Sequence, residues 1–469
     1  MLFKQIYEEK LSQYAYLIGC QETGEAFIID PLRDIDQYFE LAKKQGMNII
    51  GAADTHIHAD FLSGLREFAE RGVKVYASDE GDEDWKYEWL VAGDYHKELL
   101  KNGDVIRVGN ILIKAVHTPG HTPEHMSYIV TDGKVTEEPL GIASGDFVFV
   151  GDVGRPDLLE TAAGKKGAMR PSAQRLYKSL DWFRTLPDYL QLWPGHGAGS
   201  ACGKALGAVP ASTVGYEMRH NAAIIAGRSE DQFVDFILDG QPEPPLYFAR
   251  MKRDNRKGPD VLGELPKPVA VTSDGLDDYL RSKQPVIIDG RQIEDFVQGH
   301  LNGALCVPFD KQFNTVAGSY VSPDDAIFLI IDGQHVEEAV RDLVRVGLDH
   351  VMAYLTPSEL DQYRTTHDLV TMEMKSFNEV SDRIDNDSFQ IVDVRKATEY
   401  TEGHLNGAVQ ISHVRLPDQT ESLSRNKTLL VHCAAGGRAA SASSYLQNRG
   451  YSVIYINDLF ENSPQMLRV

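Results

Sequence analysis

The chain has 469 residues, of which 42% are hydrophobic and 9% aromatic, and its formal net charge at pH 7 is −22. A prior of about 150 residues per domain predicts roughly three domains, and this hydrophobic content excludes a globally disordered chain. The negative charge argues against a nucleic-acid partner, which would require clustered Lys and Arg.

The cysteines predict a reducing compartment. Cys20, Cys202, Cys306 and Cys433 lie far apart, without a CxxC pair, which is typical of free thiols and not of a disulfide framework. The first residues show no hydrophobic signal-peptide core, and no stretch approaches the ~20 apolar residues of a membrane span. We therefore expect a soluble, cytoplasmic, multidomain protein with no membrane or nucleic-acid partner.

The first 240 residues contain four short segments of metal-ligand residue types. They are His56–Phe61 (HIHADF), His117–His125 (HTPGHTPEH), Gly145-Asp146 and Trp193–His196 (WPGH). The first segment follows an apolar run and precedes helical spacing, so we place it on a strand-to-helix turn, where rigid elements often hold sites. Each segment alone also fits a hydrogen-bonded pair or a simple turn. Together, in this order, they predict a metal site.

A proline-rich stretch follows this first domain. Pro242, Pro244 and Pro245 lead into polar, basic residues, and Pro266 and Pro268 close the stretch. Because proline fixes φ and donates no hydrogen bond, we predict a first domain over 1–240 and an extended linker over 241–267.

After the linker the sequence repeats itself. Asp289-Gly290-Arg291 and Gly299–Ala304 (GHLNGA) recur 104 residues later as Asp393-Val394-Arg395 and Gly403–Ala408. In each copy short apolar runs alternate with helix-like segments, a pattern that favours a parallel sheet covered on both sides. We therefore predict two α/β domains, a first copy over 268–367 and a second copy over 368–469.

Cys433 follows an apolar run and opens the small, glycine-rich segment CAAGGR. A cysteine at the end of a buried strand is usually inert core. Here, backbone N–H groups at a helix start would form an anion cradle and Arg438 adds a positive charge, which should lower the thiol pKa and give a reactive thiolate. We expect Cys433 and Arg438 to be catalytic.

The first copy lacks this chemistry. Aligning the apolar runs of the two copies places Asp332 where Cys433 stands in the second, and a carboxylate in an anion cradle would repel the substrate. We therefore expect the first copy to be catalytically inactive, with Cys306 packed in its core.

The ordered segments THIHADF, PGHT, GD and PGH resemble the metallo-β-lactamase superfamily over about residues 1–240 and, within it, the persulfide dioxygenase branch. The resemblance implies an iron ion held by His56, His121 and Asp146, and a substrate contact by Arg155. Two imidazoles and one carboxylate on one face form the triad of non-heme Fe(II) oxygenases, which leaves positions for substrate and O₂.

Phe61 decides between one metal and two. A hydrolytic two-zinc site would use Asp60 and the residue at position 61 for its second ion, and a phenyl ring cannot bind a cation. We therefore expect one Fe(II) per chain, with zinc as the alternative. His58, Asp60 and His196 then orient ligands or bind water.

Three other residues near these segments have less defined roles. His117 and His125 match no ligand position, and we interpret them as structural. Cys202, soon after the last metal motif, is a candidate sulfur relay whose pKa Lys204 would lower, and a passive thiol is an equal alternative.

The loop at Cys433 resembles the active loop of rhodanese-type sulfurtransferases, and the resemblance covers roughly 375–469. Related Cys-dependent phosphatases carry the longer loop CxxxxxR, so by analogy CxxxxR suits sulfur better than phosphate. The whole chain resembles bacterial persulfide dioxygenase–rhodanese fusions. This implies an α/β protein with an N-terminal metallo-β-lactamase αββα sandwich, followed by two rhodanese-like α/β domains with parallel sheets.

The expected function is oxidation of a low-molecular-weight persulfide by O₂ to sulfite. It would be coupled to sulfur transfer through a Cys433 persulfide that forms or uses thiosulfate, in the detoxification of sulfide and persulfides. Expected partners are the persulfide, O₂ and sulfite or thiosulfate, and we expect a homodimer or homotetramer. The carrier thiol stays open, because Ala198 and Ala223 stand where some glutathione-using members have Tyr and Arg.

Two alternatives remain at this stage. One is a zinc-dependent, glyoxalase II-like thioester hydrolase fused to a sulfurtransferase. The other is a non-enzymatic redox sensor that uses Cys433, with vestigial metal motifs.

Overall fold

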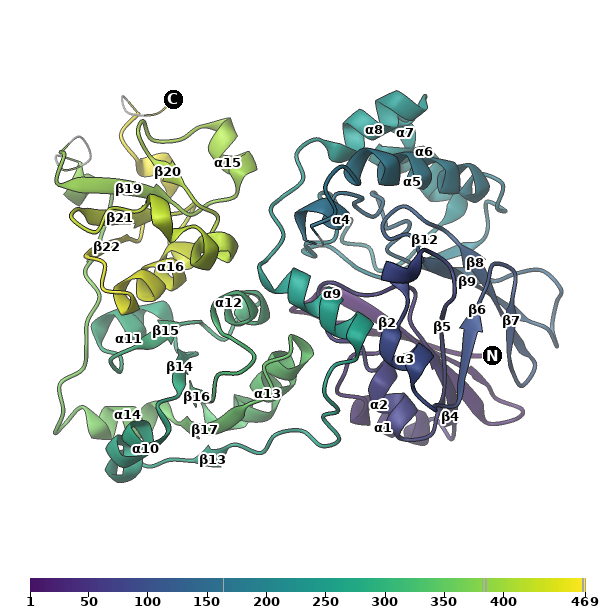
Figure 1. Ribbon diagram of the computed structural model, residues 1–469, viewed down its shortest axis with the longest axis horizontal. Helices are drawn as coiled ribbons and strands as arrows, with labels where there is room; N and C mark the ends of the chain where they lie inside the picture. Colours follow the sequence, from purple (N-terminus) through teal and green to yellow (C-terminus); the bar gives the residue numbers. More distant parts are fainter. Residues whose placement is uncertain (163, 382, 384–385, 466–467, 469) are drawn as a thin grey trace. The chain divides into compact units, whose positions relative to one another are not determined.

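The computed structural model describes residues 1–162, 164–381, 383, 386–465 and 468, and the chain divides into two compact units (Figure 1). The first unit comprises Met1–Gly263 with Arg345–Gly347, and the second comprises Glu264–Val344 with Leu348–Val469. Among the described residues, none of the helices has the length and hydrophobicity that crossing a membrane requires.

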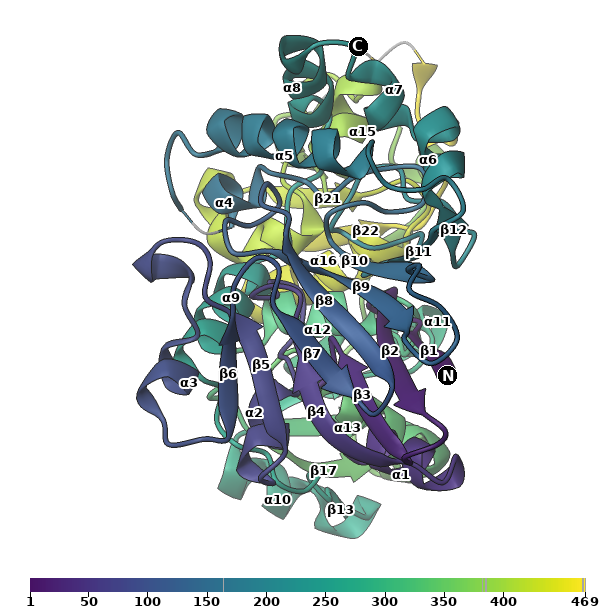
Figure 2. The ribbon, with the colours of Figure 1, turned by 90° about the vertical axis from the view of Figure 1, so that its right-hand side faces the viewer.

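Two six-stranded sheets form the first unit (Figure 2). Their strands are β1 (Leu2–Glu8), β2 (Gln13–Cys20), β3 (Glu25–Ile29), β4 (Asn48–Ala53), β5 (Lys74–Ser78), β6 (Lys97–Leu100), β7 (Val105–Val108), β8 (Ile111–His117), β9 (Met126–Asp132), β10 (Gly141–Gly145), β11 (Gln191–Pro194) and β12 (Ser212–Thr213). One sheet runs in the order β1 to β6, antiparallel as far as β3 and parallel beyond it. The other has the order β12-β11-β10-β9-β8-β7.

Nine helices of the described residues accompany these sheets. They are α1 (Asp36–Lys44), α2 (Leu65–Glu70), α3 (Glu88–Ala92), α4 (Leu158–Thr161), α5 (Met169–Phe183), α6 (Val214–His220), α7 (Ala222–Ala226), α8 (Glu230–Leu238) and α9 (Tyr247–Lys257).

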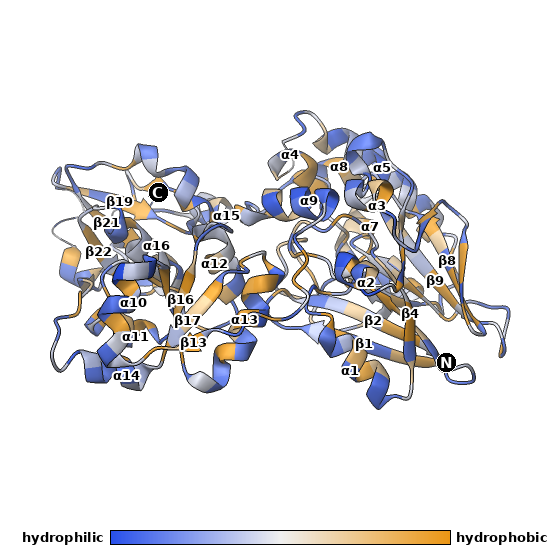
Figure 3. Cartoon of the chain, turned by 60° about the horizontal axis from the view of Figure 1, so that its bottom comes forward, coloured by the Kyte–Doolittle hydropathy of each residue, from blue (hydrophilic) through white to orange (hydrophobic). Residues whose placement is uncertain are grey.

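Two hydrophobic cores hold the layers of the first unit together. One joins the two sheets through residues such as Tyr16 and Tyr128, and the other joins the second sheet to α5 and α8 through Leu176 and Phe233. Figure 3 shows hydrophobic residues gathered along β4, β8 and β9. Helices α1 and α2 cover the first sheet, so the unit is a helix–sheet–sheet–helix sandwich, as predicted.

Helix α9 corrects the prediction of an extended linker over 241–267. Pro242, Pro244 and Pro245 stand before the helix, and Gly258, with φ +99°, ends it. These prolines therefore precede a helix and do not exclude one. Met251 and Asn255 are buried one helical turn apart, and α9 belongs to the first unit. The boundaries of the three domains stay predictions.

The second unit contains two five-stranded sheets, all of whose paired strands are parallel. The first copy has the order β13-β17-β16-β14-β15 and the second has the order β18-β22-β21-β19-β20, so the copies share one topology, as predicted. Their strands are β13 (Val269–Ala270), β14 (Val286–Asp289), β15 (Ala304–Cys306), β16 (Ile327–Ile330), β17 (Val351–Leu355), β18 (Met374–Lys375), β19 (Phe389–Asp393), β20 (Val409–Gln410), β21 (Thr428–His432) and β22 (Val453–Ile456). Their helices are α10 (Leu276–Lys283), α11 (Ile293–Gln298), α12 (Phe313–Tyr320), α13 (Val336–Arg345), α14 (Pro357–Tyr363), α15 (Ala397–Glu402) and α16 (Gly437–Asn448).

The repeated sequence motifs are structural in both copies. In each, the Arg of the DxR motif donates to the Asp two residues earlier and to the carbonyl of the glycine that opens GHLNGA. The distances are 2.7 and 2.8 Å for Arg291 with Asp289 and Gly299, and 2.6 and 2.8 Å for Arg395 with Asp393 and Gly403. The motif thus ties the end of a central strand to the chain beyond the next helix.

Strand register corrects the predicted match between Asp332 and Cys433. The Asp that ends the central strand pairs with Ile330 in the first copy and with His432 in the second. The next residue is therefore Ile331 in the first copy and Cys433 in the second. The prediction was wrong by one residue because aligning apolar runs did not reveal that β21 extends through a histidine.

The first copy therefore has an isoleucine where the second has its thiol. Ile331 is buried, and Cys306 is also buried in this copy, as predicted. The position lacks a nucleophile because an apolar side chain fills it, not because a carboxylate repels an anion.

Candidate functional site

Three of the predicted ligands meet at one edge of the sandwich. His56 follows β4, His121 lies between β8 and β9, and Asp146 follows β10. His121 Nε2 is 3.5 Å and His56 Nε2 4.0 Å from Asp146 Oδ2. One ligand atom of each residue lies within 4.8 Å of the others, and all three side chains are buried.

Hydrogen bonds fix the tautomers of both imidazoles. Thr55 Oγ1 donates to Asp30 Oδ2 at 3.0 Å, so it is free to accept from His56 Nδ1 at 2.9 Å. His121 Nδ1 is 3.0 Å from the carbonyl oxygen of Arg155, which can only accept. In both rings the proton therefore sits on Nδ1, and the Nε2 lone pair is available to a metal.

The electrostatics of the three residues suit a cation. Burial, reinforced by neighbouring histidines, holds the pKa of His56 well below its usual value, and burial also lowers the pKa of His121. Both rings are thus neutral, as metal binding requires. In the described part of the chain, neither carboxylate oxygen of Asp146 has a hydrogen-bond partner, although both are buried.

These observations show that the residues fit a metal ion. A buried polar atom without a partner costs roughly 1–3 kcal/mol, and more when it is charged. A divalent cation bound by His56, His121 and Asp146 would remove that cost and use two neutral imidazoles and one carboxylate, a donor set found in non-heme iron sites.

The backbone around Asp146 is shaped for this placement. Gly145 has φ +52°, and a Cβ there would lie 2.6 Å from Thr55 Oγ1 and 2.7 Å from His125 Nε2. His125 Nε2 accepts from the Asp146 N–H at 3.1 Å. His125 is thus a structural partner of the ligand loop, in keeping with its interpretation from sequence. His117 lies outside the cluster and contacts the Pro123 carbonyl oxygen at 2.8 Å.

The three residues predicted to orient ligands separate into two groups. His196 Nε2 lies 3.3 Å from Asp60 Oδ2 and 3.5 Å from Asp146 Oδ1. His58 instead pairs with Asp30 at 3.2 Å and stacks on Phe61, whose ring centre is 4.3 Å away. Asp60 and His196 therefore border the candidate metal position, whereas His58 belongs to the carboxylate network behind it.

Cys202 lies beside this second group. Its sulfur, a carboxylate oxygen of Asp60 and a ring nitrogen of His196 fall within 4.8 Å of one another. Burial, and then the charges of Asp60 and Asp146, raise the pKa of the Cys202 thiol well above its ordinary value. The expected lowering by Lys204 is wrong, because its ammonium donates to carbonyl oxygens of Phe236 and Asp239 at 2.6 and 2.9 Å.

Arg155 is wholly buried, and protein groups occupy most of its donors. It bonds both oxygens of Asp157, at 2.8 and 2.6 Å, and the carbonyl oxygens of Ala201 and Pro242 at 3.0 and 2.7 Å. The guanidinium therefore fastens the segment before Cys202, and the backbone carbonyl oxygen of Arg155 positions His121. Its contact with substrate stays a prediction.

Sequence reasoning missed the residue that holds the HIHADF loop. The side chain of Asn255 on α9 donates to the carbonyl oxygens of His58 and Phe61 at 2.9 and 2.7 Å, and accepts from the Ser63 N–H at 2.9 Å. It is buried. No motif marks an asparagine almost 200 residues from its partners, so only the fold reveals it.

In the second copy, Cys433 directly follows β21 and α16 begins at Gly437. Gly436 has φ +91°, and a Cβ there would collide with the side chain of Asn457, so the loop requires glycine at this position. Cys433 is buried. The geometry is that of the predicted loop, a cysteine at the carboxyl end of a parallel strand facing a helix N-terminus.

Arg438 is engaged by an unpredicted partner. Its two terminal nitrogens donate to both carboxylate oxygens of Glu399 at 2.6 and 2.7 Å. Burial acts to lower the pKa of Arg438, but Glu399 and then the Cys433 sulfur raise it above its ordinary value. Arg438 thus lies beside the thiol as predicted, with its charge balanced by a carboxylate.

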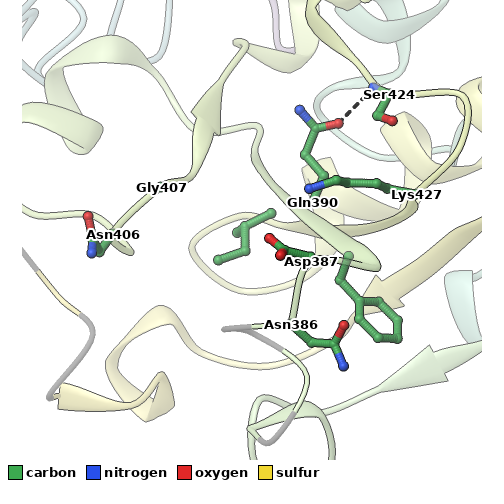
Figure 4. A pocket seen from close by; sticks show the side chains of 9 residues that line it. Asn386, Asp387, Gln390, Asn406, Gly407, Ser424 and Lys427 are labelled. Carbon is green, nitrogen blue, oxygen red and sulfur yellow. Dashed lines mark hydrogen bonds between the residues drawn. The ribbon is translucent and has the colours of Figure 1, made fainter.

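The second copy has a cavity at each end of its parallel strands. One of about 220 Å³ includes Cys433 and Arg438 in its lining. Another of about 300 Å³ lies at the opposite, amino-terminal strand edge, around Gln390 and Lys427 (Figure 4). Parallel α/β sheets bind ligands at the carboxyl ends of their strands, so the cavity at Cys433 is the candidate site.

Comparisons with known proteins match both parts of the chain. The metallo-beta-lactamase superfamily model matches residues 9–196, and the rhodanese-like domain model matches residues 272–356 and 376–460. A crystal structure described as a metallo-beta-lactamase from Staphylococcus aureus is 41% identical, with a TM-score of 0.68 over 76% of this chain and 99% of that chain.

Two curated relatives match the first part. The mitochondrial persulfide dioxygenase ETHE1 of Bos taurus is 28% identical over 42% of this chain and 68% of its own length. A hydroxyacylglutathione hydrolase of Nitrosococcus oceani is 30% identical over 39% of this chain and 67% of its own length.

Fold, site and comparisons define a metallo-β-lactamase-type domain joined to two rhodanese-like domains. The chain belongs to the metallo-β-lactamase superfamily, and persulfide dioxygenases are among its homologues.

Proposed function

We propose that the first unit is an iron-dependent persulfide dioxygenase and that the second copy is a sulfurtransferase that handles the same sulfur. The observation that carries the proposal is the set of His56, His121 and Asp146, with neutral rings and a buried carboxylate that has no hydrogen-bond partner among the described residues. Its resemblance to non-heme iron donor sets and the persulfide dioxygenase relatives favour iron.

The proposed reaction is RSSH + O₂ + H₂O → RSH + SO₃²⁻ + 2 H⁺, where RSH is a low-molecular-weight thiol. Fe(II) held by the three ligands would supply activation of O₂. The chain's own residues hold the two imidazoles in one tautomer, and Phe61 places an apolar wall where a second metal would need a ligand. Asp60 and His196 orient water, and Arg155 fastens the adjoining loop.

The second unit would carry sulfur onward. The Cys433 thiolate accepts a sulfane sulfur as a persulfide and passes it to sulfite or to a thiol, so that thiosulfate is formed or used. Its place at the end of β21, beside Arg438, supports this role. Coupling the two activities would clear sulfide and persulfides.

Cys202 is proposed as a relay between these chemistries. Its position in one cluster with Asp60 and His196 supports access to sulfur at the metal centre. Mass spectrometry of protein treated with persulfide should find one added sulfur on the Cys202 peptide, and an unmodified peptide under conditions that label Cys433 would contradict the relay.

The central test is reconstitution of the metal-free chain with Fe(II), followed by O₂ uptake over a panel of persulfides. We expect one iron per chain and one O₂ consumed per persulfide sulfur oxidised. Zinc-loaded protein serves as the control, because the zinc ion cannot change its oxidation state. Iron-loaded protein that consumes no O₂ with any persulfide would contradict the proposal.

A zinc-dependent thioester hydrolase remains the second candidate. The hydroxyacylglutathione hydrolase relative favours it, as does the position of Asp60, His196 and Asp146 in one cluster. It predicts two zinc ions per chain and thioester hydrolysis, which metal analysis and an activity assay distinguish from the dioxygenase.

We also propose a cytoplasmic location and a homodimer or homotetramer. The four cysteines are all free, which supports a reducing compartment.

A further inference from the structure

The cavity beside Cys433 is built by both rhodanese-like copies. The second copy contributes the catalytic loop, with Cys433 and Arg438. The opposite wall comes from the first copy, through Ile293, Pro308, Asp310, Gln312 and Val316. The first copy thus forms part of the cavity although it has no thiol of its own at the corresponding position.

Hydrogen bonds between the two copies fix this wall against the catalytic copy. The backbone N–H of Cys306 donates to Ser444 Oγ on α16 at 2.9 Å. Asn448 Nδ2, on the same helix, donates to the carbonyl oxygens of Gly303 and Ala304 at 2.9 and 3.0 Å. Helix α16 therefore carries the Cys433 loop at its start and holds β15 of the first copy along its length (Figure 1).

The charges around this cavity do not favour a small dianion. Arg438 is the cationic residue of the described lining, and Glu399 pairs with it through two hydrogen bonds. Burial, then the charges of Arg438 and Lys396, lower the pKa of His413 to about 3, so this lining residue is neutral. Asp310 adds an exposed carboxylate from the first copy.

We propose that the first copy is the recognition half of the Cys433 site and that Asp310 selects a sulfane-sulfur donor carrying an ammonium group. The donor class is an organic aminothiol persulfide, in preference to the thiosulfate dianion. Pro308, Ile293 and Val316 provide an apolar wall for its carbon chain, and Asp310 faces its charged end. This inference rests on the proposed sulfurtransferase role of Cys433 and names the substrate class of that site.

The transfer step balances without an oxidant. The Cys433 thiolate attacks the terminal sulfur of R–S–SH, a new S–S bond forms between Cys433 Sγ and that sulfur, and the donor's own S–S bond breaks. The thiolate RS⁻ leaves with the electron pair, and the transferred sulfur keeps its proton, giving Cys433–S–SH. Backbone N–H groups at the start of α16 face the charge on sulfur during this exchange.

The test measures sulfur transfer to cyanide by the full chain without oxygen, so that the proposed dioxygenase reaction cannot occur. The donors are cysteamine persulfide, 3-mercaptopropionate persulfide of similar size but opposite terminal charge, and thiosulfate. We expect wild type to prefer cysteamine persulfide in kcat/KM. Asp310→Asn should raise its KM about three- to five-fold, the range for an exposed charge pair, and leave kcat unchanged.

Asp324→Asn, an exposed carboxylate of the same copy outside the cavity, is the matched control and should change no donor's KM. Glu399→Gln should release the Arg438 charge and raise kcat/KM for thiosulfate several-fold. Equal use of the two persulfides by wild type, or equal effects of Asp310→Asn on both, would overturn the inference. Absence of transfer from all donors would instead contradict the sulfurtransferase role itself.

Discussion

In the proposed one-metal centre, Phe61 is decisive because its phenyl ring cannot bind a cation. Its ring is wholly buried against His58, at the position where a two-metal site needs a ligand. The adjoining Asp60 and His196 keep buried polar atoms without hydrogen-bond partners among the described residues. A single residue therefore distinguishes the proposed one-metal centre from a site that has most of the donors for two ions.

Phe61→His should restore binding of a second ion. Imidazole and phenyl rings are similar in shape, so the fold should survive, and Asp60, His196 and Asp146 already lie together. We expect zinc content to rise from one toward two ions per chain in elemental analysis, with persulfide-dependent O₂ uptake falling. Phe61→Leu is the control and should keep one ion. A stoichiometry of one in both variants would exclude position 61 as the deciding residue.

Thr55→Val should weaken metal binding without removing a ligand. The substitution keeps the shape but deletes the hydroxyl between His56 and Asp30, so His56 loses the acceptor that fixes its tautomer. Loss of such a partner typically costs roughly 10- to 100-fold in metal affinity. Competition with a chelator measures the change, and Thr55→Ser should restore most of it. Equal affinities for wild type and Thr55→Val would contradict this role.

The candidate metal ligands could be predicted from the sequence because each lies in a short, recognisable motif. His56, His121 and Asp146 stand in short motifs because strand-end turns hold them. Asp30 orients His56 through Thr55, and Glu399 pairs with Arg438. Neither residue lies in a motif. Their partners are set by the packing of separate elements, so the sequence contained no local signal for them.

At the scale of elements, helix α9 has a role that was not predicted from its sequence. The prolines before it suggested an extended chain, although Tyr247, Phe248, Met251 and Asn255 recur at helical spacing and are buried. Proline restricts the interior of a helix and not its approach. The helix places Asn255 against the backbone of the metal-binding loop, so what resembled a linker is a support of the site.

Asn255→Ala should loosen that loop. It would leave two buried carbonyl oxygens and one N–H without their partner, a loss of about 3 kcal/mol or more in the free energy of unfolding. Denaturant unfolding of the metal-loaded protein measures this, and chelator competition should show weaker metal binding. Lys257→Ala, exposed on the same helix, is the control. A stability and metal affinity equal to those of wild type would show that the loop keeps its conformation without Asn255.

At the scale of the whole molecule, an internal repeat predicted two parallel sheets, and the structure confirms them. The constant spacing between DxR and GHLNGA reflects the same ion pair in both copies. The contribution of the first copy to the Cys433 cavity could not be predicted, because it depends on how α16 packs against β15. A copy that has no nucleophile at this position can therefore still contribute to the cavity of the other copy.

Two variants should separate the chemistries that the molecule combines. His121→Ala removes a ligand of the metal centre, so O₂ uptake should fall at least ~100-fold, while anaerobic sulfur transfer through Cys433 continues. Cys433→Ser removes the nucleophile, so O₂ uptake should persist and sulfite should accumulate in place of thiosulfate. Oxygen electrode traces and chromatography of the sulfur products measure both outcomes. Loss of anaerobic transfer in His121→Ala, with circular dichroism unchanged, would show that the sites do not act independently.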